Sequence, residues 1–327
     1  MRKRWRQLHR VLGLVAGLWL AWLGLTGSFL AMGQSLDRVL HPQLFRCADA
    51  PPAPLQAAAQ AVKALYPERK LERLDFGRPL RFWLDDGQIV YVDPAGPKIL
   101  GDLAKSQTVR GFVLPLHELA EPFLPVVAGL SALVLLSGWI LQKPDRRALP
   151  PRKAYDWHRA LGWVSTPALL VAMLTGTLLV EYKLVDQLLR GGHKPIAPSL
   201  PETPEAGLDL DAQVAQAARV WPQAQLIRMQ WTKKDIQIRV RQPGENNPVG
   251  RSFIHLDSHS GKVTELESAL ADPWSVRQLQ GTYGVHAGYF PGGGLLALVG
   301  LTPVILWGTG VRLRQKRTAK AGSRSSA

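Results

Sequence analysis

The sequence has almost no cysteine, since Cys47 is the only one in 327 residues. A single cysteine excludes an intrachain disulfide and the cysteine clusters of structural zinc and iron–sulfur sites. The glycine-rich phosphate loop, the G-x-S-x-G turn of serine hydrolases and the H-E-x-x-H zinc motif are also missing. The sequence therefore shows none of the common catalytic motifs of soluble enzymes.

Acidic residues are also scarce, with 25 Asp and Glu against 40 Lys and Arg and a net charge of +15. The excess lies in residues 1–10, 143–159 and 312–327, which carry five, six and six basic side chains, with two acids in the second segment only. A strongly basic chain can indicate nucleic-acid binding. Here the basic segments flank long apolar runs, which is typical of the cytoplasmic ends of membrane proteins. We therefore expect membrane lipid as a partner and no nucleic acid.

Four apolar segments are long enough to cross a membrane: 11–33, 123–141, 161–180 and 293–311. Each can span a hydrocarbon core of about 30 Å as a helix. The first exceeds an ordinary signal-peptide core, so an uncleaved anchor is expected. Because short basic segments stay inside and long loops are translocated, both termini are predicted in the cytoplasm and both long connections outside.

The chain repeats itself. His-Arg-x-Leu-Gly opens the first and third segments at His9 and His158, and Leu-Thr-Gly closes them at the same spacing, ending at Gly27 and Gly176. Likewise, the spacing from His117 to Trp139 is almost equal to the spacing from His286 to Trp307. Each long connection predicts one helix followed by three short strands.

The predicted fold class is thus an integral membrane α-helical protein with four transmembrane helices, built as two tandem parallel repeats around a pseudo-two-fold axis. Each repeat carries a small α+β domain. The expected parts are a basic flank with the first transmembrane helix (1–34), the first outer domain (35–116), the second helix (117–142), a cytoplasmic link (143–157), the third helix (158–183), the second outer domain (184–285), the fourth helix (286–311) and a basic tail (312–327).

The histidines form two pairs by depth. His9 and His158 lie at the cytoplasmic ends of their helices, and His117 and His286 at the outer ends, so each pair can converge across the axis. Two facing imidazoles are the ligand set of a bis-histidine haem. Gly13 and Gly162 follow the first pair by one helical turn, on the same helix face, and leave room for a flat ring.

Structural alternatives remain open for these residues. The small-residue face continues through Ala16, Gly24 and Gly27 in the first segment and through Ser165 and Gly176 in the third. Such stripes also allow close helix packing without a cofactor. A lone histidine at a membrane boundary is usually a hydrated interfacial residue. Four further histidines lie in the connections; two of them flank a predicted turn, where a metal site or a solvated turn is possible. The four are His41, His193, His255 and His259.

The His-Arg-x-Leu-Gly and Leu-Thr-Gly motifs, together with the modules of one helix and three strands, resemble the PepSY-associated transmembrane family. These are the iron-regulated membrane proteins that include inner-membrane ferric-siderophore reductases. The resemblance covers essentially the whole chain. It implies PepSY-like periplasmic domains, a place in the bacterial cytoplasmic membrane, and two b-type haems held by His9 with His158 and by His117 with His286. It further implies electron transfer from an inner donor, either a quinol or a cytoplasmic flavoprotein, to a ferric siderophore in the periplasm.

Two other functions stay open at this point. The PepSY-like modules could bind peptides or restrain a periplasmic protease, with the helices acting only as anchors and the histidines dispensable. Alternatively, the haems could serve another periplasmic acceptor, such as copper, a sulfur oxyanion or a quinone.

Overall fold

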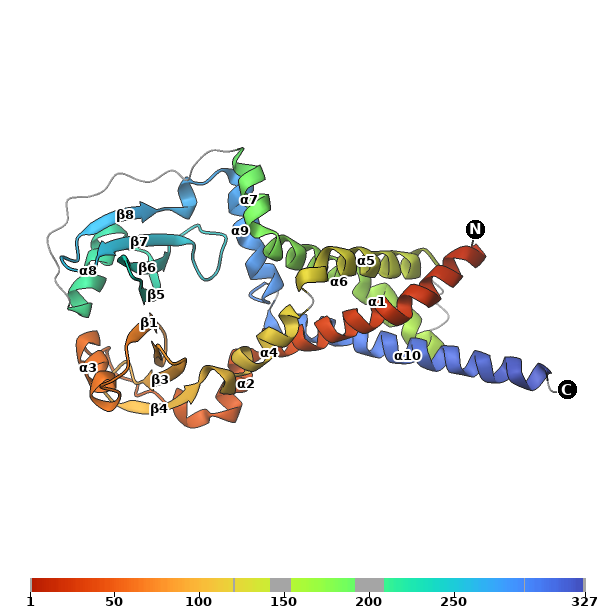
Figure 1. The fold of residues 1–327 in the computed structure, drawn as a ribbon, viewed down its shortest axis with the longest axis horizontal. Coiled ribbons are helices and arrows are strands. Elements are labelled where there is room, and N and C mark those ends of the chain that lie inside the picture. Colours follow the sequence, from red (N-terminus) through yellow and green to blue (C-terminus); the bar gives the residue numbers. More distant parts are fainter. Residues whose placement is uncertain (1, 120, 142–153, 192–208, 291, 326–327) are drawn as a thin grey trace. The chain divides into compact units, whose positions relative to one another are not determined.

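The computed structural model describes residues 2–119, 121–141, 154–191, 209–290 and 292–325 (Figure 1). Most of the link at 143–157, as well as His193, lies outside these residues. The chain divides into two compact units. We call them the helical unit, which comprises Met1–Gly33, Val113–Glu181 and Val285–Ala327, and the sheet unit, which comprises Gln34–Phe112 and Tyr182–Gly284.

The helical unit is a bundle of α1 (Arg2–Ala31), α5 (Leu124–Leu141), α6 (Ala154–Val180) and α10 (Gly293–Ser325). Within the described residues, four helical stretches are long and apolar enough to cross a membrane: Lys3–Ala31, Val109–Leu141, Ala154–Val180 and Gly293–Lys316. The outside of the bundle is apolar. Val15, Val164 and Leu298 lie on it, and each is more than 60% exposed. An apolar exterior of this kind suits lipid rather than water.

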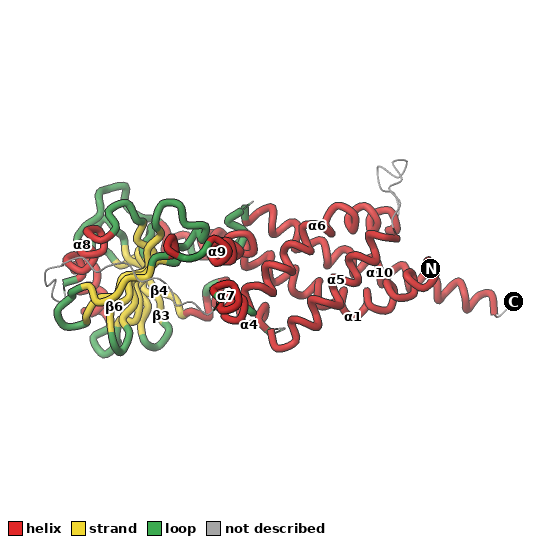
Figure 2. The backbone as a smooth tube through the Cα atoms, turned by 90° about the horizontal axis from the view of Figure 1, so that it is seen from above, coloured by secondary structure: helices red, strands yellow, loops and turns green. Residues whose placement is uncertain are grey.

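The order of helices around the bundle determines which faces meet. Both α1 and α6 pack against α5 and against α10, so α1 and α6 lie on one diagonal and α5 and α10 on the other (Figure 2). Gly24 and Gly300 bring α1 and α10 together, since a Cβ on Gly24 would lie 2.2 Å from the Gly300 carbonyl oxygen. Ser28 strengthens this contact by donating to the Ala297 carbonyl at 2.8 Å.

Two short helices precede α5 and α10 and carry the second pair of histidines. His117 lies on α4 (Val109–Glu118), which is followed by the 3-10 turn η3 (Glu121–Phe123). His286 is the last residue of α9 (Trp274–His286). The sequence analysis began the second and fourth transmembrane helices at these histidines. In the structure each histidine lies at the end of a separate helix, and at Gly288 a positive φ of 79° accompanies the break before α10.

The sheet unit contains one antiparallel sheet of eight strands in the order β4-β3-β2-β1-β5-β6-β7-β8. The first four strands are β1 (Leu71–Asp75), β2 (Leu80–Leu84), β3 (Gln88–Val92) and β4 (Ile99–Ala104), and the last four are β5 (Gln225–Trp231), β6 (Asp235–Arg241), β7 (Ser252–Asp257) and β8 (Val263–Glu267). The remaining elements of the unit are α2 (Gly33–Leu40), η1 (Pro42–Phe45), α3 (Leu55–Leu65), η2 (Lys105–Gln107), α7 (Tyr182–Arg190), α8 (Leu210–Val220) and η5 (Ala269–Ala271).

The single sheet corrects the expectation of three strands in each of two small domains. A fourth strand follows in each half, and β1 pairs with β5 through Leu74 and Met229. This pairing satisfies backbone groups that two separate sheets would leave at open edges. Short strands containing Gly-Asp and Glu have little apolar pattern, which is why β4 and β8 were missed.

One face of the sheet, which we call the core face, is covered by α3 and α8. Leu74, Phe82, Met229, Ile238 and Ile254 are fully buried there. Because side chains alternate along a strand, the residues between them point to the opposite face, which we call the second face. At the β3 and β4 edge, η1 covers that face with a small apolar cluster consisting of Leu44, Ile89, Tyr91 and their neighbours.

Candidate functional site: two histidine pairs in the helical bundle

The four predicted histidines meet as two pairs inside the helical unit. The ring centroids of His9 and His158 are 6.1 Å apart, with the ring planes at 78°. Those of His117 and His286 are 6.3 Å apart, with the planes at 48°. Thr26 contacts His117 and lies on α1, the helix that also carries His9. The rise along α1 from position 9 to position 26, at about 1.5 Å per residue, therefore separates the two pairs by about 25 Å along the bundle.

Each ring of the first pair is held by the helix next to its own. Nδ1 of His9 donates to the Val134 carbonyl at 3.1 Å and contacts the Ser137 hydroxyl at 3.0 Å, both on α5. Nδ1 of His158 donates to the Leu306 carbonyl on α10 at 3.0 Å. The Thr309 hydroxyl lies 3.0 Å from the same His158 nitrogen.

The second pair is held in the same way by α6 and α1, the helices that carry the first pair. Nδ1 of His286 donates to the Ala172 carbonyl on α6 at 3.1 Å and lies 3.3 Å from the Thr175 hydroxyl. Nδ1 of His117 lies 2.8 Å from the Thr26 hydroxyl on α1. The same hydroxyl lies 2.8 Å from the Trp22 carbonyl, which can only accept, so a hydroxyl that donates there is an acceptor for His117.

The carbonyl contacts determine the tautomer of His9, His158 and His286. A carbonyl can only accept, so Nδ1 carries the proton and Nε2 keeps its lone pair. Within the described residues, no hydrogen-bond partner is found for any of the four Nε2 atoms. A metal-bound histidine normally presents one bare nitrogen to the metal and donates the other N–H to a carbonyl or hydroxyl. His9, His158 and His286 are prepared in this manner by carbonyls, and Nδ1 of His117 is engaged by the Thr26 hydroxyl.

The separation of the rings also fits one metal between each pair. A bond from metal to imidazole nitrogen is about 2 Å long, so two nitrogens on opposite sides of one metal lie about 4 Å apart. Each centroid lies about 1 Å beyond its nitrogen, which places the two centroids about 6 Å apart. The observed distances of 6.1 and 6.3 Å match this arrangement.

A repeated dipeptide holds the four rings, and the sequence analysis recognised only part of it. In each case a hydroxyl residue that contacts Nδ1 is followed by a glycine that faces Cε1 of the same ring. The four dipeptides are Ser137-Gly138 for His9, Thr309-Gly310 for His158, Thr26-Gly27 for His117 and Thr175-Gly176 for His286. The sequence analysis used Leu-Thr-Gly as a marker of the repeat and placed Gly27 and Gly176 on the small-residue face, but it missed the other two dipeptides.

The glycines of the dipeptides are needed because the rings lie against the backbone. A Cβ on Gly176 would lie 2.8 Å from Cε1 of His286, and a Cβ on Gly138 would lie 3.0 Å from Cε1 of His9. Corresponding distances are 3.4 Å at Gly27 and 3.6 Å at Gly310. The signal in the sequence is a hydroxyl residue followed by glycine, once in every apolar segment.

Other residues that the sequence analysis assigned to the haem face have mixed outcomes. A Cβ on Gly13 would meet no atom within 4 Å, so the space beside this turn of α1 is open. Gly162 lies in the corresponding turn of α6. Gly24, in contrast, was wrongly placed on that face, since it forms the contact between α1 and α10 described above.

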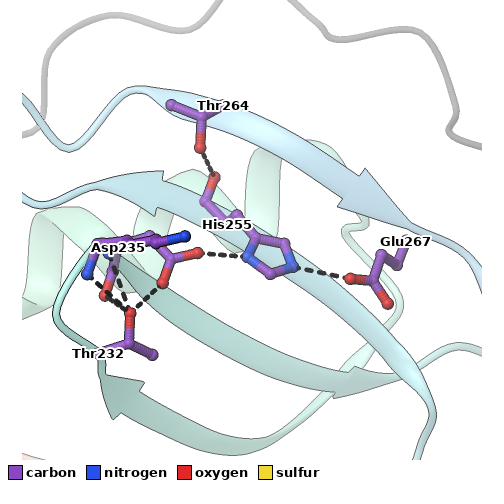
Figure 3. A network of polar contacts seen from close by, with 6 residues as sticks. Thr232, Asp235, His255, Thr264 and Glu267 are labelled. Atoms are coloured by element: carbon purple, nitrogen blue, oxygen red, sulfur yellow. Dashed lines mark hydrogen bonds and ion pairs between the residues drawn. The ribbon is translucent and has the colours of Figure 1, made fainter.

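The histidines of the connections do not join either pair. His255 lies on β7 rather than beside a turn, and Figure 3 shows it between two carboxylates. Its Nδ1 is 2.5 Å from Asp235 and its Nε2 is 3.2 Å from Glu267. The hydrogen bond to Glu267, together with the one to Asp235, raises the pKa of His255 to about 9 despite its burial. This ring is therefore protonated at neutral pH and is a poor metal ligand. In the described part of the chain, no group of three or more His, Cys, Asp or Glu residues could hold a metal ion.

Comparison with known proteins gives a family match. The family model described as "PepSY-associated TM region" matches residues 6–317. A search of curated proteins found no match.

Proposed function

The chain belongs to the family of PepSY-associated transmembrane regions, and we propose that it is a di-haem protein that carries electrons across a membrane. The observation that carries this proposal is the geometry of the two histidine pairs. Both pairs have the ring separation of a bis-histidine site, and all four Nδ1 atoms are engaged so that Nε2 is the free ligand.

His9 and His158 would hold one b-type haem, and His117 and His286 the other. When bound, each haem supplies one-electron chemistry at a potential tuned by its surroundings. The residues of the chain orient the ligands: the backbone carbonyls on the neighbouring helices keep Nδ1 of His9, His158 and His286 protonated, the hydroxyls contact Nδ1 of all four rings, and the glycines permit the rings to approach the neighbouring helix. Open space at Gly13 would admit the edge of the flat ring. The apolar bundle would exclude water from both sites.

Matched spacings support a two-repeat architecture, with α1 and α6 equivalent and α5 and α10 equivalent. The spacing from His9 to Thr26 equals the spacing from His158 to Thr175. The two threonine hydroxyls then hold equivalent histidines. Basic residues 1–10 and 312–327 support cytoplasmic termini. The sheet unit would then lie in the periplasm of a bacterium, with the chain in the inner membrane.

The family supports a ferric siderophore as electron acceptor. Reduction to Fe(II) would weaken binding by hard oxygen ligands and release the metal. Electrons would enter at the cytoplasmic pair and leave at the outer pair. The inner donor would be a quinol or a cytoplasmic flavoprotein.

The first experiment is a dithionite-reduced minus oxidised absorbance spectrum of the detergent-purified chain, with haem counted per chain. Two low-spin b-type haems are expected, and one in each of His158→Ala and His286→Ala. His259→Ala is the control, because this exposed histidine belongs to the sheet unit and to neither pair. A folded wild-type chain without colour would contradict the proposal and favour a membrane-anchored peptide-binding module.

The acceptor needs a separate experiment. The chemically reduced protein is mixed with a ferric siderophore, and haem reoxidation is followed by stopped-flow absorbance. Fast, saturable reoxidation coupled to Fe(II) release is expected. Reoxidation by quinone or Cu(II) but by no ferric siderophore in a panel would reject the ferric reductase while leaving the haem sites intact.

A further inference from the structure

The second face of the sheet carries an unusual concentration of arginine. We call Arg73, Arg81, Arg228, Arg239 and Arg251 the arginine cluster. Each belongs to the sheet unit and is half-buried. Four of them lie on strands, next to Leu74, Phe82, Met229 and Ile238, which are buried on the core face, so alternation directs these four arginines to the second face. Arg251 lies one residue before β7, close enough for its charge to act on Arg239.

Strand register brings three of these arginines and Asp75 into one row across the centre of the sheet. Arg81 on β2 is opposite Asp75 on β1, and Asp75 is opposite Arg228 on β5. Arg228 is in turn opposite Arg239 on β6. The row therefore reads plus, minus, plus, plus over four adjacent strands.

One carboxylate serves three of the arginines. Asp75 accepts from Arg228 at 2.7 Å and from Arg73 at 3.0 Å, and it lies 3.6 Å from Arg81. The Arg73 guanidinium also stacks on the Trp83 ring at 3.7 Å, while its buried Nε has no hydrogen-bond partner among the described residues. Three positive charges around one negative charge leave an excess of positive charge beside Asp75.

The other two arginines contact neutral groups instead. Arg239 donates through Nε and Nη2 to the Gly250 carbonyl. Arg251 lies over the Tyr182 ring at 4.7 Å. Glu245 is nearby, but its oxygens accept from the backbone amides of Gln242 and Arg251 and from the Ser252 hydroxyl.

The cluster costs stability as it stands. Like charges directly opposite each other on adjacent strands are destabilising. Burial, followed by the charges of Arg251 and Arg228, lowers the pKa of Arg239 to about 10. A partly buried charge without an opposite charge beside it is destabilising, and apolar residues in its place are often neutral or stabilising, so stability alone does not account for Arg239 facing Arg228. An anion bound on the row would remove this repulsion.

We propose that the arginine cluster is a binding site for a small polyanion bearing two or more carboxylate or phosphate groups. Guanidinium forks recognise both groups through paired hydrogen bonds. Nε of Arg228 is bonded to Asp75, and Nε and Nη2 of Arg239 are bonded to the Gly250 carbonyl, so the two Nη groups of Arg228 and Nη1 of Arg239 are the donors offered to one such group. Arg251 provides a third cation beside them. The proposal concerns the sheet unit alone and does not depend on haem in the helical unit.

The test is equilibrium dialysis of the full-length chain at pH 7 in a neutral maltoside detergent, so that no anionic detergent occupies the site. Radiolabelled citrate and pyrophosphate are the two probes, each at an ionic strength held constant with sodium chloride. Saturable binding of either probe at one site per chain is expected. Citrate alone would identify a polycarboxylate site, and pyrophosphate alone a phosphate site.

Arg228→Gln/Arg239→Gln is expected to weaken binding at least about tenfold, the loss typical of a charged hydrogen-bond pair. Arg219→Gln/Lys233→Gln removes two exposed charges from the same unit and is expected to bind like the wild type. Arg239→Gln alone keeps all partners of Asp75 and serves if the double variant fails to fold. No saturable binding of either probe, or an equal loss in the Arg219→Gln/Lys233→Gln control, would overturn the proposal.

Discussion

The four glycines beside the histidines act at the scale of single residues, since each sets how closely a ring approaches the neighbouring helix. A Cβ on Gly176 would lie 2.8 Å from Cε1 of His286, whereas one on Gly310 would lie 3.6 Å from Cε1 of His158. The first distance forces a shift and the second is ordinary contact. We expect Gly176→Ala to displace its ring at a cost of about 1–3 kcal/mol and Gly310→Ala to be tolerated.

Haem content after purification checks this expectation. Gly176→Ala should lose about half of the haem, because one of two sites is disturbed, while Gly310→Ala should keep both. Gly138→Ala and Gly27→Ala, with Cβ distances of 3.0 and 3.4 Å, should fall between them in that order. The same haem content in all four variants would show that the glycines do not position the rings.

At this scale the sequence predicted the histidines and their pairing but not what holds them. His9, His158, His117 and His286 stand out because they repeat. Ser137-Gly138 and Thr309-Gly310 do not, because the residues before them differ and serine stands in one of them where the other has threonine. The misplacement of Gly24 has a similar cause, since small residues serve helix packing and ligand space equally well.

At the scale of elements, His255 joins three adjacent strands, β6, β7 and β8, through Asp235 and Glu267 (Figure 3). Its pKa is about 9 in the folded chain against an ordinary value of 6.5, so the folded state binds this proton more tightly than the unfolded state. The resulting stabilisation is complete below pH 6.5 and is lost as the pH rises through 9. Because Glu267 is 44% exposed, we expect about 1–2 kcal/mol.

Thermal unfolding of the full-length chain between pH 6 and pH 9.5 measures this contribution. The midpoint of the wild type should fall relative to that of His255→Gln as the pH rises, because the variant has no proton to lose at this position. His259→Gln, at an exposed histidine of the same unit, should follow the wild type. Parallel pH profiles for wild type and His255→Gln would contradict the ion-pair account.

The elements themselves were predicted unevenly from the sequence. Long apolar runs and alternating strands are local patterns, so the four bundle helices and six of the strands were found. Pairing of β1 with β5 joins residues from opposite halves of the chain, as with Asp75 and Arg228. No local pattern encodes that pairing, so the union of both halves in one sheet could not be read from the sequence.

At the scale of the whole molecule, the charge distribution predicts which side of the membrane each part occupies. Basic residues at both ends should stay in the cytoplasm, which leaves the sheet unit in the periplasm. The chain suits cysteine labelling, because Cys47 is its only cysteine. In a Cys47→Ser background, Arg219→Cys places a thiol on an exposed position of α8, and Lys316→Cys places one near the end of α10.

Intact spheroplasts are treated with a membrane-impermeant maleimide. Arg219→Cys should be labelled at once, whereas Lys316→Cys should be labelled only after the cells are lysed. Cys47→Ser alone should remain unlabelled and serves as the blank. Labelling of Lys316→Cys but not of Arg219→Cys in intact spheroplasts would invert the topology. The His9 and His158 pair would then be the outer site, and electrons leaving the protein toward the sheet unit would have to be delivered to the cytoplasm.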